Sequence, residues 1–409
     1  MKKLLFIHLL LICAMTVSAE ENQEKIPPVR LKNRGFEIAL IKTHVGFNNS
    51  FIAAKDIFKQ TAVIDYGDLT NGFKTNAGVN IAPAAININW KDRWGFGLDM
   101  ANISVFGNVE ISKNLLQFQQ SENDKFGVGA SAFLDFGIPT FFHIRKLKVT
   151  LRPAVYLPIA YTEPGVIYTF TEKGNGFYAE AKYDMYIYSP IPLEGVEKGA
   201  IKYKEIPGAI NTTTLGFDMN LGLEFPLLSW LDVGVNIQNI PLKPSTLKNY
   251  MQLTGKAFFD SSVIDLVDVI NNHKLPPDAY GYPEEFKPVY GTGEKKIMRP
   301  FKFISYALYC PFESKILSLI PSVGLGISLI YANTVSVEAG IKFRLDLANM
   351  FVTTIGIGYE DQLWRNSVLF AINLKAIELD IGVSFESQDF VKSWQGAGAG
   401  IDIGLKLGW

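Results

Sequence analysis

The sequence AGAGIDIGLKLGW, residues 397–409, alternates between apolar residues and small or polar ones. Successive side chains of a β-strand point to opposite sides of its sheet, so the alternation predicts a strand with one apolar and one polar face. A transmembrane β-barrel is built from such strands, because one face contacts lipid and the other faces the lumen. The apolar positions are Ala399, Ile401, Ile403, Leu405, Leu407 and Trp409.

The first residues of the chain have the features of a secretory signal peptide. A positive start, MKK, precedes the largely apolar run LLFIHLLLICA, and VSA supplies a small-residue cleavage site. The apolar run is too short to span a bilayer as a helix. We therefore expect residues 1–19 to be a leader and residues 20–35 to be a periplasmic N-terminal segment.

Composition excludes several classes of protein. The net charge of −1 offers no basic field for nucleic acid. Of the 2 cysteines, Cys13 lies in the leader, so Cys310 has no intrachain partner for a disulfide. The chain contains 29 Phe, 17 Tyr, 6 Trp and 35 Gly, which is typical of an all-β protein with recurring glycines and aromatic residues.

The alternating pattern recurs along the chain and predicts an antiparallel transmembrane β-barrel of 14 strands over residues 36–409. A hairpin formed by 165–171 and 177–188 either joins the barrel, making 16 strands, or stands in an external loop. The expected barrel strands are 36–47, 76–90, 94–111, 126–138, 147–158, 212–225, 231–240, 299–310, 319–331, 335–347, 351–360, 367–376, 377–386 and 397–409.

The connections between these strands sort by length. If the last strand ends in the periplasm, the short connections fall on the periplasmic side and the long ones, 48–75, 159–211 and 241–298, fall outside. Bacterial barrels have short periplasmic turns and longer external loops. The asymmetry therefore indicates the outer membrane, with outer-membrane lipid as a partner of the apolar faces.

No motif in the sequence indicates catalysis or a bound cofactor. The four histidines, His8, His44, His143 and His273, do not occur at metal-ligand spacings, and no Cys-x-x-Cys pair exists. Glycine pairs are more simply explained as strand positions where bulk is disfavoured. We expect neither an enzyme nor a metalloprotein.

The segment FFDSSVIDLVDVINN, residues 258–272, has apolar residues at helical spacing inside a long external loop. Two interpretations remain open: a helix packed on its own loop, or a lid over a hydrophobic groove. The groove residues would be Phe259, Val263, Leu266, Val267 and Ile270.

A second amphipathic stretch, SFIAAKDIFK at 50–59, follows the first expected strand. It either plugs the lumen or packs beneath the external loops. The candidate plug residues are Phe51, Ile52, Ile57 and Phe58.

Two resemblances add to this interpretation. The ending with Leu405, Leu407 and Trp409 resembles the C-terminal β-signal of outer-membrane proteins, which implies recognition by the barrel-assembly machinery. With 14 strands and its longest loops third and fourth, the chain resembles the FadL-type transporters of long-chain fatty acids and other hydrophobic compounds. That family has a hatch before its first strand, whereas only 20–35 precede the first strand here, so 48–75 would have to supply a plug.

These observations favour passive uptake of small hydrophobic molecules, such as long-chain fatty acids. Two alternatives remain: a general diffusion porin, and a surface adhesin that uses the loop 241–298.

Overall fold

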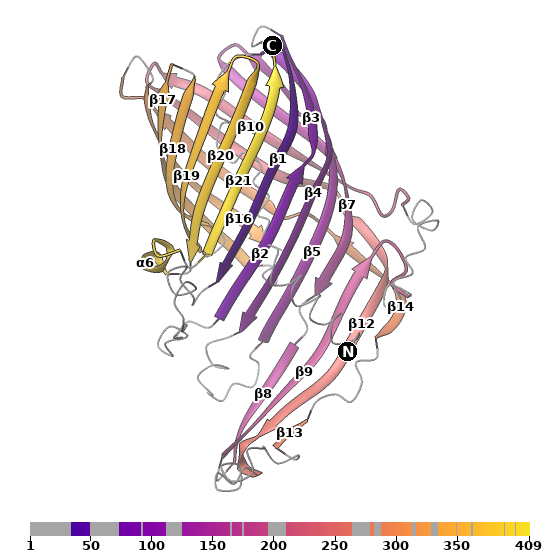
Figure 1. The fold of residues 1–409 in the computed structure, drawn as a ribbon. Helices are drawn as coiled ribbons and strands as arrows, with labels where there is room; N and C mark the ends of the chain where they lie inside the picture. Colours follow the sequence, from indigo (N-terminus) through magenta and orange to yellow (C-terminus); the bar gives the residue numbers. More distant parts are fainter. Residues whose placement is uncertain are drawn as a thin grey trace.

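The chain forms a closed antiparallel β-barrel of 14 strands, as the sequence predicts, with a smaller sheet extending from one end (Figure 1). Within the part of the chain that is described, we find no helix of the length and hydropathy needed to cross a membrane. The computed structural model describes residues 34–49, 73–90, 93–111, 125–163, 166–173, 176–194, 210–263, 279–281, 288–312, 316–328, 334–348, 350–360, 363–387, 389–396 and 398–409.

Two of the barrel strands are interrupted. Pro83 separates β2 from β3, and residues 138–139 separate β5 from β6, but each pair follows a single course around the barrel. In order around the barrel the strands are β1 (Phe36–Asn49), β2 (Phe73–Ala82) with β3 (Ala84–Trp90), β4 (Trp94–Ile111), β5 (Lys125–Gly137) with β6 (Thr140–Ile144), β7 (Leu147–Glu163), β10 (Gly216–Leu228), β11 (Leu231–Lys243), β15 (Phe301–Tyr309), β16 (Leu317–Ser328), β17 (Thr334–Leu347), β18 (Phe351–Glu360), β19 (Leu363–Leu374), β20 (Ile377–Ser387) and β21 (Gly398–Gly408).

The barrel closes where β21 pairs with β1. Leu407 lies opposite Ile38, and Phe36 and Trp409 exchange two backbone hydrogen bonds of 3.1 Å each. Their rings lie 4.9 Å apart. The strand expected over 397–409 therefore forms the closing seam, with Ile401 and the other alternate apolar residues on its outer face.

The two faces of the barrel strands differ in polarity, as expected when one face contacts lipid and the other faces the lumen. On β17, Val335 and Val337 are 64% and 59% exposed, whereas Ser336 and Glu338 between them are buried. Exposed positions alternate with buried ones on much of β16 and β20 as well. This outer apolar belt and the closed ring are the architecture of single-chain barrels of the bacterial outer membrane.

The hairpin expected from 165–171 and 177–188, which allowed either 14 or 16 strands, does not enter the barrel. β7 pairs directly with β10, from Lys148↔Glu224 to Tyr156↔Gly216. The hairpin strands, β8 (Val166–Lys173) and β9 (Gly176–Ser189), instead extend beyond the end opposite Trp409 (Figure 1).

The two long connections that are expected to be external, 159–211 and 241–298, contribute strands to one sheet. β9 pairs with β12 along its length, from Ser189↔Asn249 to Tyr178↔Asp260. β8 also pairs with β9, and we call the resulting five-stranded extension the external sheet. Its other strands are β12 (Ser245–Asp260), the short β13 (Tyr280–Gly281) and β14 (Val289–Ile297).

The helix expected over 258–272 is wrong at its start. Residues 258–260 continue β12 because they pair with β9 on one side and with β13 on the other. A single 3₁₀ turn, η4 (Ser261–Val263), follows, and residues 264–278 lie outside the described residues. Long-range strand pairing has overridden the local helical spacing.

Candidate functional site

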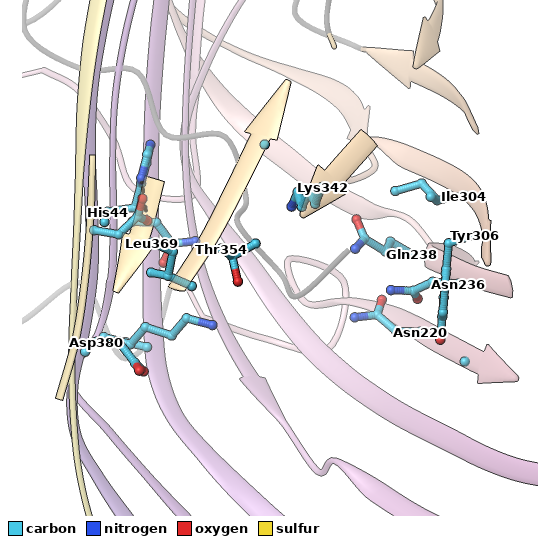
Figure 2. A pocket seen from close by; sticks show the side chains of 18 of the residues that line it. His44, Asn220, Asn236, Gln238, Ile304, Tyr306, Lys342, Thr354, Leu369 and Asp380 are labelled. Carbon is cyan, nitrogen blue, oxygen red and sulfur yellow. Dashed lines mark hydrogen bonds and ion pairs between the residues drawn. The ribbon is translucent and has the colours of Figure 1, made fainter. Parts of the chain in front are cut away.

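The lumen contains a cavity of about 680 Å³ lined by inward-facing side chains of many barrel strands. Figure 2 shows His44, Thr354 and Asp380 on one wall, facing Asn220, Asn236 and Gln238 on the other. Amides, hydroxyls and charged groups line this cavity together with apolar side chains such as Ile304 and Leu369. The lumen can therefore accept polar groups as well as apolar ones.

One group of charges joins the barrel wall to the external sheet. Arg299, just before β15, forms a bidentate pair with Asp218 of β10, at 2.6 and 2.7 Å. It also donates to Asp135 of β5 at 2.8 Å, and Arg152 of β7 pairs with the same Asp135 and with Asp99. Arg299 is only 3% exposed. These five residues form a buried network in which each arginine binds two carboxylates.

Tyr156 connects this network to an apolar cluster at the mouth of the barrel. Its ring lies 5.3 Å from the Arg299 guanidinium, and its hydroxyl donates to the Ile297 carbonyl at 3.0 Å. Phe133, Tyr156, Leu247 and Ile297 are buried together, where β5 and β7 meet the roots of β12 and β14. We call these four residues the mouth cluster.

A second group of charges lies across the lumen. His44 Nδ1 is 2.8 Å from Asp402 Oδ1, on the seam between β1 and β21. Arg365 donates to Glu386 at 2.5 Å and to Glu360 at 3.2 Å. No three acidic, histidine or cysteine side chains among the described residues are grouped so as to hold a metal ion.

Three tyrosines gather on one face of the external sheet, next to the mouth. Tyr186 and Tyr188 of β9 alternate on the same face, and Tyr250 of β12 lies opposite Tyr188. The three ring centroids are 5.5 to 6.2 Å apart. Tyr188 also packs against the mouth cluster. We call these three residues the tyrosine cluster.

Polar groups at the edges fix the orientation of the tyrosine cluster. The Gln252 amide donates to the Tyr186 hydroxyl and to Asp184, each at 2.7 Å. Lys295 lies over the Tyr188 ring at 5.9 Å. Partial burial lowers the pKa of Lys295 and raises the pKa of Tyr188.

Glycines on β14 make room for the cluster. A Cβ atom at Gly291 would lie 2.5 Å from the Tyr250 hydroxyl oxygen, and one at Gly293 would lie 3.2 Å from the same ring. The Tyr250 ring therefore lies flat on the neighbouring strand, where any larger residue would displace it.

Of the five predicted groove residues, only Phe259 and Val263 lie among the described residues. Phe259 is half-buried in β12, opposite Ala179, and strand alternation places it on the face away from Phe258 and the tyrosine cluster. Val263 is 45% exposed in η4. Leu266, Val267 and Ile270 lie outside the described residues, as do the plug candidates Phe51, Ile52, Ile57 and Phe58.

The tyrosine cluster and Arg299 were not expected from the sequence. The alternation of Tyr186 and Tyr188 in YDMYIY was visible, but its partner Tyr250 is 62 residues further on, and no local pattern connects them. Arg299 pairs with residues 81 and 164 positions away. Only the barrel topology brings these groups together.

Comparisons with known proteins give structural relatives but no sequence relatives. No family model and no curated protein sequence matches the chain. The toluene transporter TodX of Pseudomonas putida is similar over 97% of both chains, with 10% identity and a TM-score of 0.47. A FadL homologue of Pseudomonas aeruginosa shares 8% identity over 91% of this chain and 90% of its own, with a TM-score of 0.46. The toluene transporter TbuX of Ralstonia pickettii shares 10% identity over 93% and 90%, with a TM-score of 0.44. The chain thus resembles, over nearly its whole length, two toluene transporters and a FadL homologue.

Proposed function

We propose that this protein is an outer-membrane barrel for the passive uptake of small hydrophobic molecules, which first bind at the tyrosine cluster. The observation that carries the proposal is the contact between the tyrosine cluster of the external sheet and the buried mouth cluster of the barrel. Tyr188 belongs to the tyrosine cluster and at the same time packs on the mouth cluster. A ligand held by the rings would therefore lie at the entrance to the lumen.

Tyrosine rings suit a hydrophobic ligand of varied shape. Each ring offers a large apolar face with few rotatable bonds, so little conformational entropy is lost on binding. The ligand class follows from this surface: aromatic or acyl compounds, of which long-chain fatty acids are one example. No covalent step is needed, because passive uptake follows the concentration gradient.

The test is the binding of a fluorescent fatty acid and of a fluorescent aromatic hydrocarbon to the protein in detergent-free nanodiscs. The double variant Tyr186→Ser/Tyr250→Ser removes two rings of the cluster. Burying one large apolar side chain against a ligand contributes about 1.5–3 kcal/mol. We therefore expect roughly ten- to hundredfold weaker binding.

Tyr290→Ser is the matched control, because Tyr290 lies opposite Met251 and points to the other face of the same sheet. It should leave binding unchanged. Equal loss in both variants, or no loss in either, contradicts binding at the tyrosine cluster. Absence of binding by the parent protein contradicts hydrophobic uptake itself.

A second candidate function rests on the lumen. Its lining of charged and amide side chains favours diffusion of polar solutes, as in a general porin. Swelling of proteoliposomes in sugars of increasing size distinguishes the two. Rapid swelling without hydrophobic binding supports the porin, and hydrophobic binding without swelling supports the first proposal.

We also propose that the barrel-assembly machinery recognises the outer face of β21 during assembly. Leu405 and Leu407 are half-buried between β20 and β1, and Trp409 is 75% exposed at the rim. This apolar edge ends in an aromatic ring, as in the C-terminal β-signal that the sequence resembles. That resemblance supports its recognition by the barrel-assembly machinery.

A further inference from the structure

A short helix, α6 (Phe390–Ser393), connects β20 and β21 at the end of the barrel opposite Trp409 (Figure 1). The Asp389 carboxylate accepts a hydrogen bond of 2.9 Å from the Lys392 amide and so caps its first turn. The helix ends at Ser393, and Trp394 is its C-cap. Figure 1 shows α6 standing out from the barrel wall rather than over the mouth.

The helix packs on the outer face of the barrel wall. The Asn366 amide of β19 donates to the Ser393 hydroxyl at 2.8 Å, and the Trp364 ring lies 5.0 Å from the Phe390 ring. Asn366 and Trp364 share their strand face with Val368, which is 45% exposed in the lipid-facing belt. The helix therefore covers the external end of that belt.

The contact between β19 and α6 explains why a polar residue, Asn366, can lie on the lipid-facing side of β19. An asparagine amide facing hydrocarbon without a partner is unfavourable. Here Asn366 is buried beneath α6, and Ser393, which is fully buried, accepts its hydrogen bond. The helix is thus part of the membrane-facing surface and not of the lumen.

The outer side of α6 is itself apolar. Phe390, Val391 and Trp394 are 44%, 60% and 56% exposed. They continue the apolar belt formed on β20 by Val383 and Phe385, which are 44% and 43% exposed. A protruding patch of three large apolar side chains is unfavourable in water. Aromatic rings are favoured at the boundary between acyl chains and headgroups.

We propose that α6 is a membrane anchor, with Phe390, Val391 and Trp394 inserted among the acyl chains of the outer leaflet just beneath the headgroups. Interfacial helices bury their apolar face about 5–10 Å into this boundary. The occupant of the patch is lipid, because the patch is continuous with the lipid-facing belt. The anchor holds the β20–β21 connection on the outside of the barrel and fixes the depth of this side of the wall.

Depth-dependent quenching tests the anchor. A polarity-sensitive fluorophore is attached to Val391→Cys in a Cys310→Ser background, and the protein is reconstituted in lipid bilayers. Thr254→Cys on the external sheet, which is exposed, is the matched control. We expect nitroxides on acyl carbons near the headgroup to quench the label at position 391, and aqueous iodide to leave it bright. The label at position 254 should show the reverse.

A second measurement does not depend on the labelled variant. The tryptophan emission of Trp394→Phe is subtracted from that of the parent in bilayers of brominated lipid. The difference should be a blue-shifted emission that is lost when the bromine lies near the headgroup. A water-exposed emission that bromine does not quench, or iodide quenching of the label at position 391, overturns the proposal.

Discussion

At the scale of single residues, the lumen depends on glycines that accept a tyrosine ring from the next strand. A Cβ atom at Gly234 would lie 2.2 Å from Tyr306 Cζ, and the Tyr306 hydroxyl donates to Glu224 at 3.1 Å. At Gly222, by contrast, the nearest atom would be Thr150 Cβ at 3.4 Å, an ordinary contact. The two glycines face the same lumen, but only Gly234 must leave room for a tyrosine ring.

We therefore expect Gly234→Ala to destabilise the barrel by about 1–3 kcal/mol, because the ring must move and its hydrogen bond is strained. Gly222→Ala is the control and should change stability little. Urea unfolding in lipid vesicles measures both. Equal midpoints for the two variants would contradict a role for the Tyr306 ring.

Replacing Arg299 should also destabilise the barrel, because buried carboxylates would lose their positively charged partner. In Arg299→Gln, Asp218 loses its bidentate partner and Asp135 loses one of two arginines. Breaking a buried pair typically costs about 3–5 kcal/mol. We expect a lower temperature for loss of the folded band on unboiled gels, whereas Arg93→Gln, at an exposed arginine, should behave as the parent. An unchanged temperature for Arg299→Gln would show that the network is dispensable.

At the scale of elements, the two faces of each strand should differ in what they tolerate. On β16, Leu325 is 51% exposed in the lipid-facing belt, and Ser322 lines the lumen cavity. A lysine facing lipid near the midplane costs about 2–4 kcal/mol. Leu325→Lys should therefore reduce the folded band, and Ser322→Lys should leave it intact. Equal yields of folded protein would mean that the faces are assigned wrongly.

The strands were largely predictable because alternation is a local signal. The expected strand 94–111 agrees with β4 at both ends. The expected strands 367–376 and 377–386 are separated by a tight turn in which Lys375 has a φ of 53°. The external sheet was not predictable in the same way. The segment 258–260 has helical spacing, and only its pairing with β9, about 80 residues earlier in the chain, makes it a strand.

The sequence also leaves open which strands are neighbours. Both 14 and 16 strands satisfied the even number expected of such barrels. The choice depends on the register between β7 and β10, which pair over residues 148–156 and 216–224. The tyrosine cluster depends on the same choice, because β9 meets β12 only outside the barrel.

At the scale of the whole molecule, the barrel and the external sheet are separable. The ring closes through the β7–β10 and β11–β15 pairs without any strand of the external sheet. We expect replacement of residues 166–189 by a short Gly-Ser linker to leave a folded, heat-modifiable barrel, because loops beyond the ring tolerate change. The same variant should lose hydrophobic-probe binding, since it lacks Tyr186 and Tyr188. Failure of the variant to fold would show that the sheet is needed for closure.

The seam between β1 and β21 has a consequence for the order of events in biogenesis. Every other contact around the ring joins barrel strands that follow one another in the chain, but the second edge of β1 must wait for the strand that ends near Trp409. The long separation costs the finished barrel little, because closure entropy rises by only about 0.6 kcal/mol per doubling of length. The unfinished sheet, however, presents two unpaired edges, β1 and β20, which can pair with a neighbouring chain. These edges stay open until β21 docks, so the β1–β21 seam is the contact that protects the whole sheet from pairing with other chains.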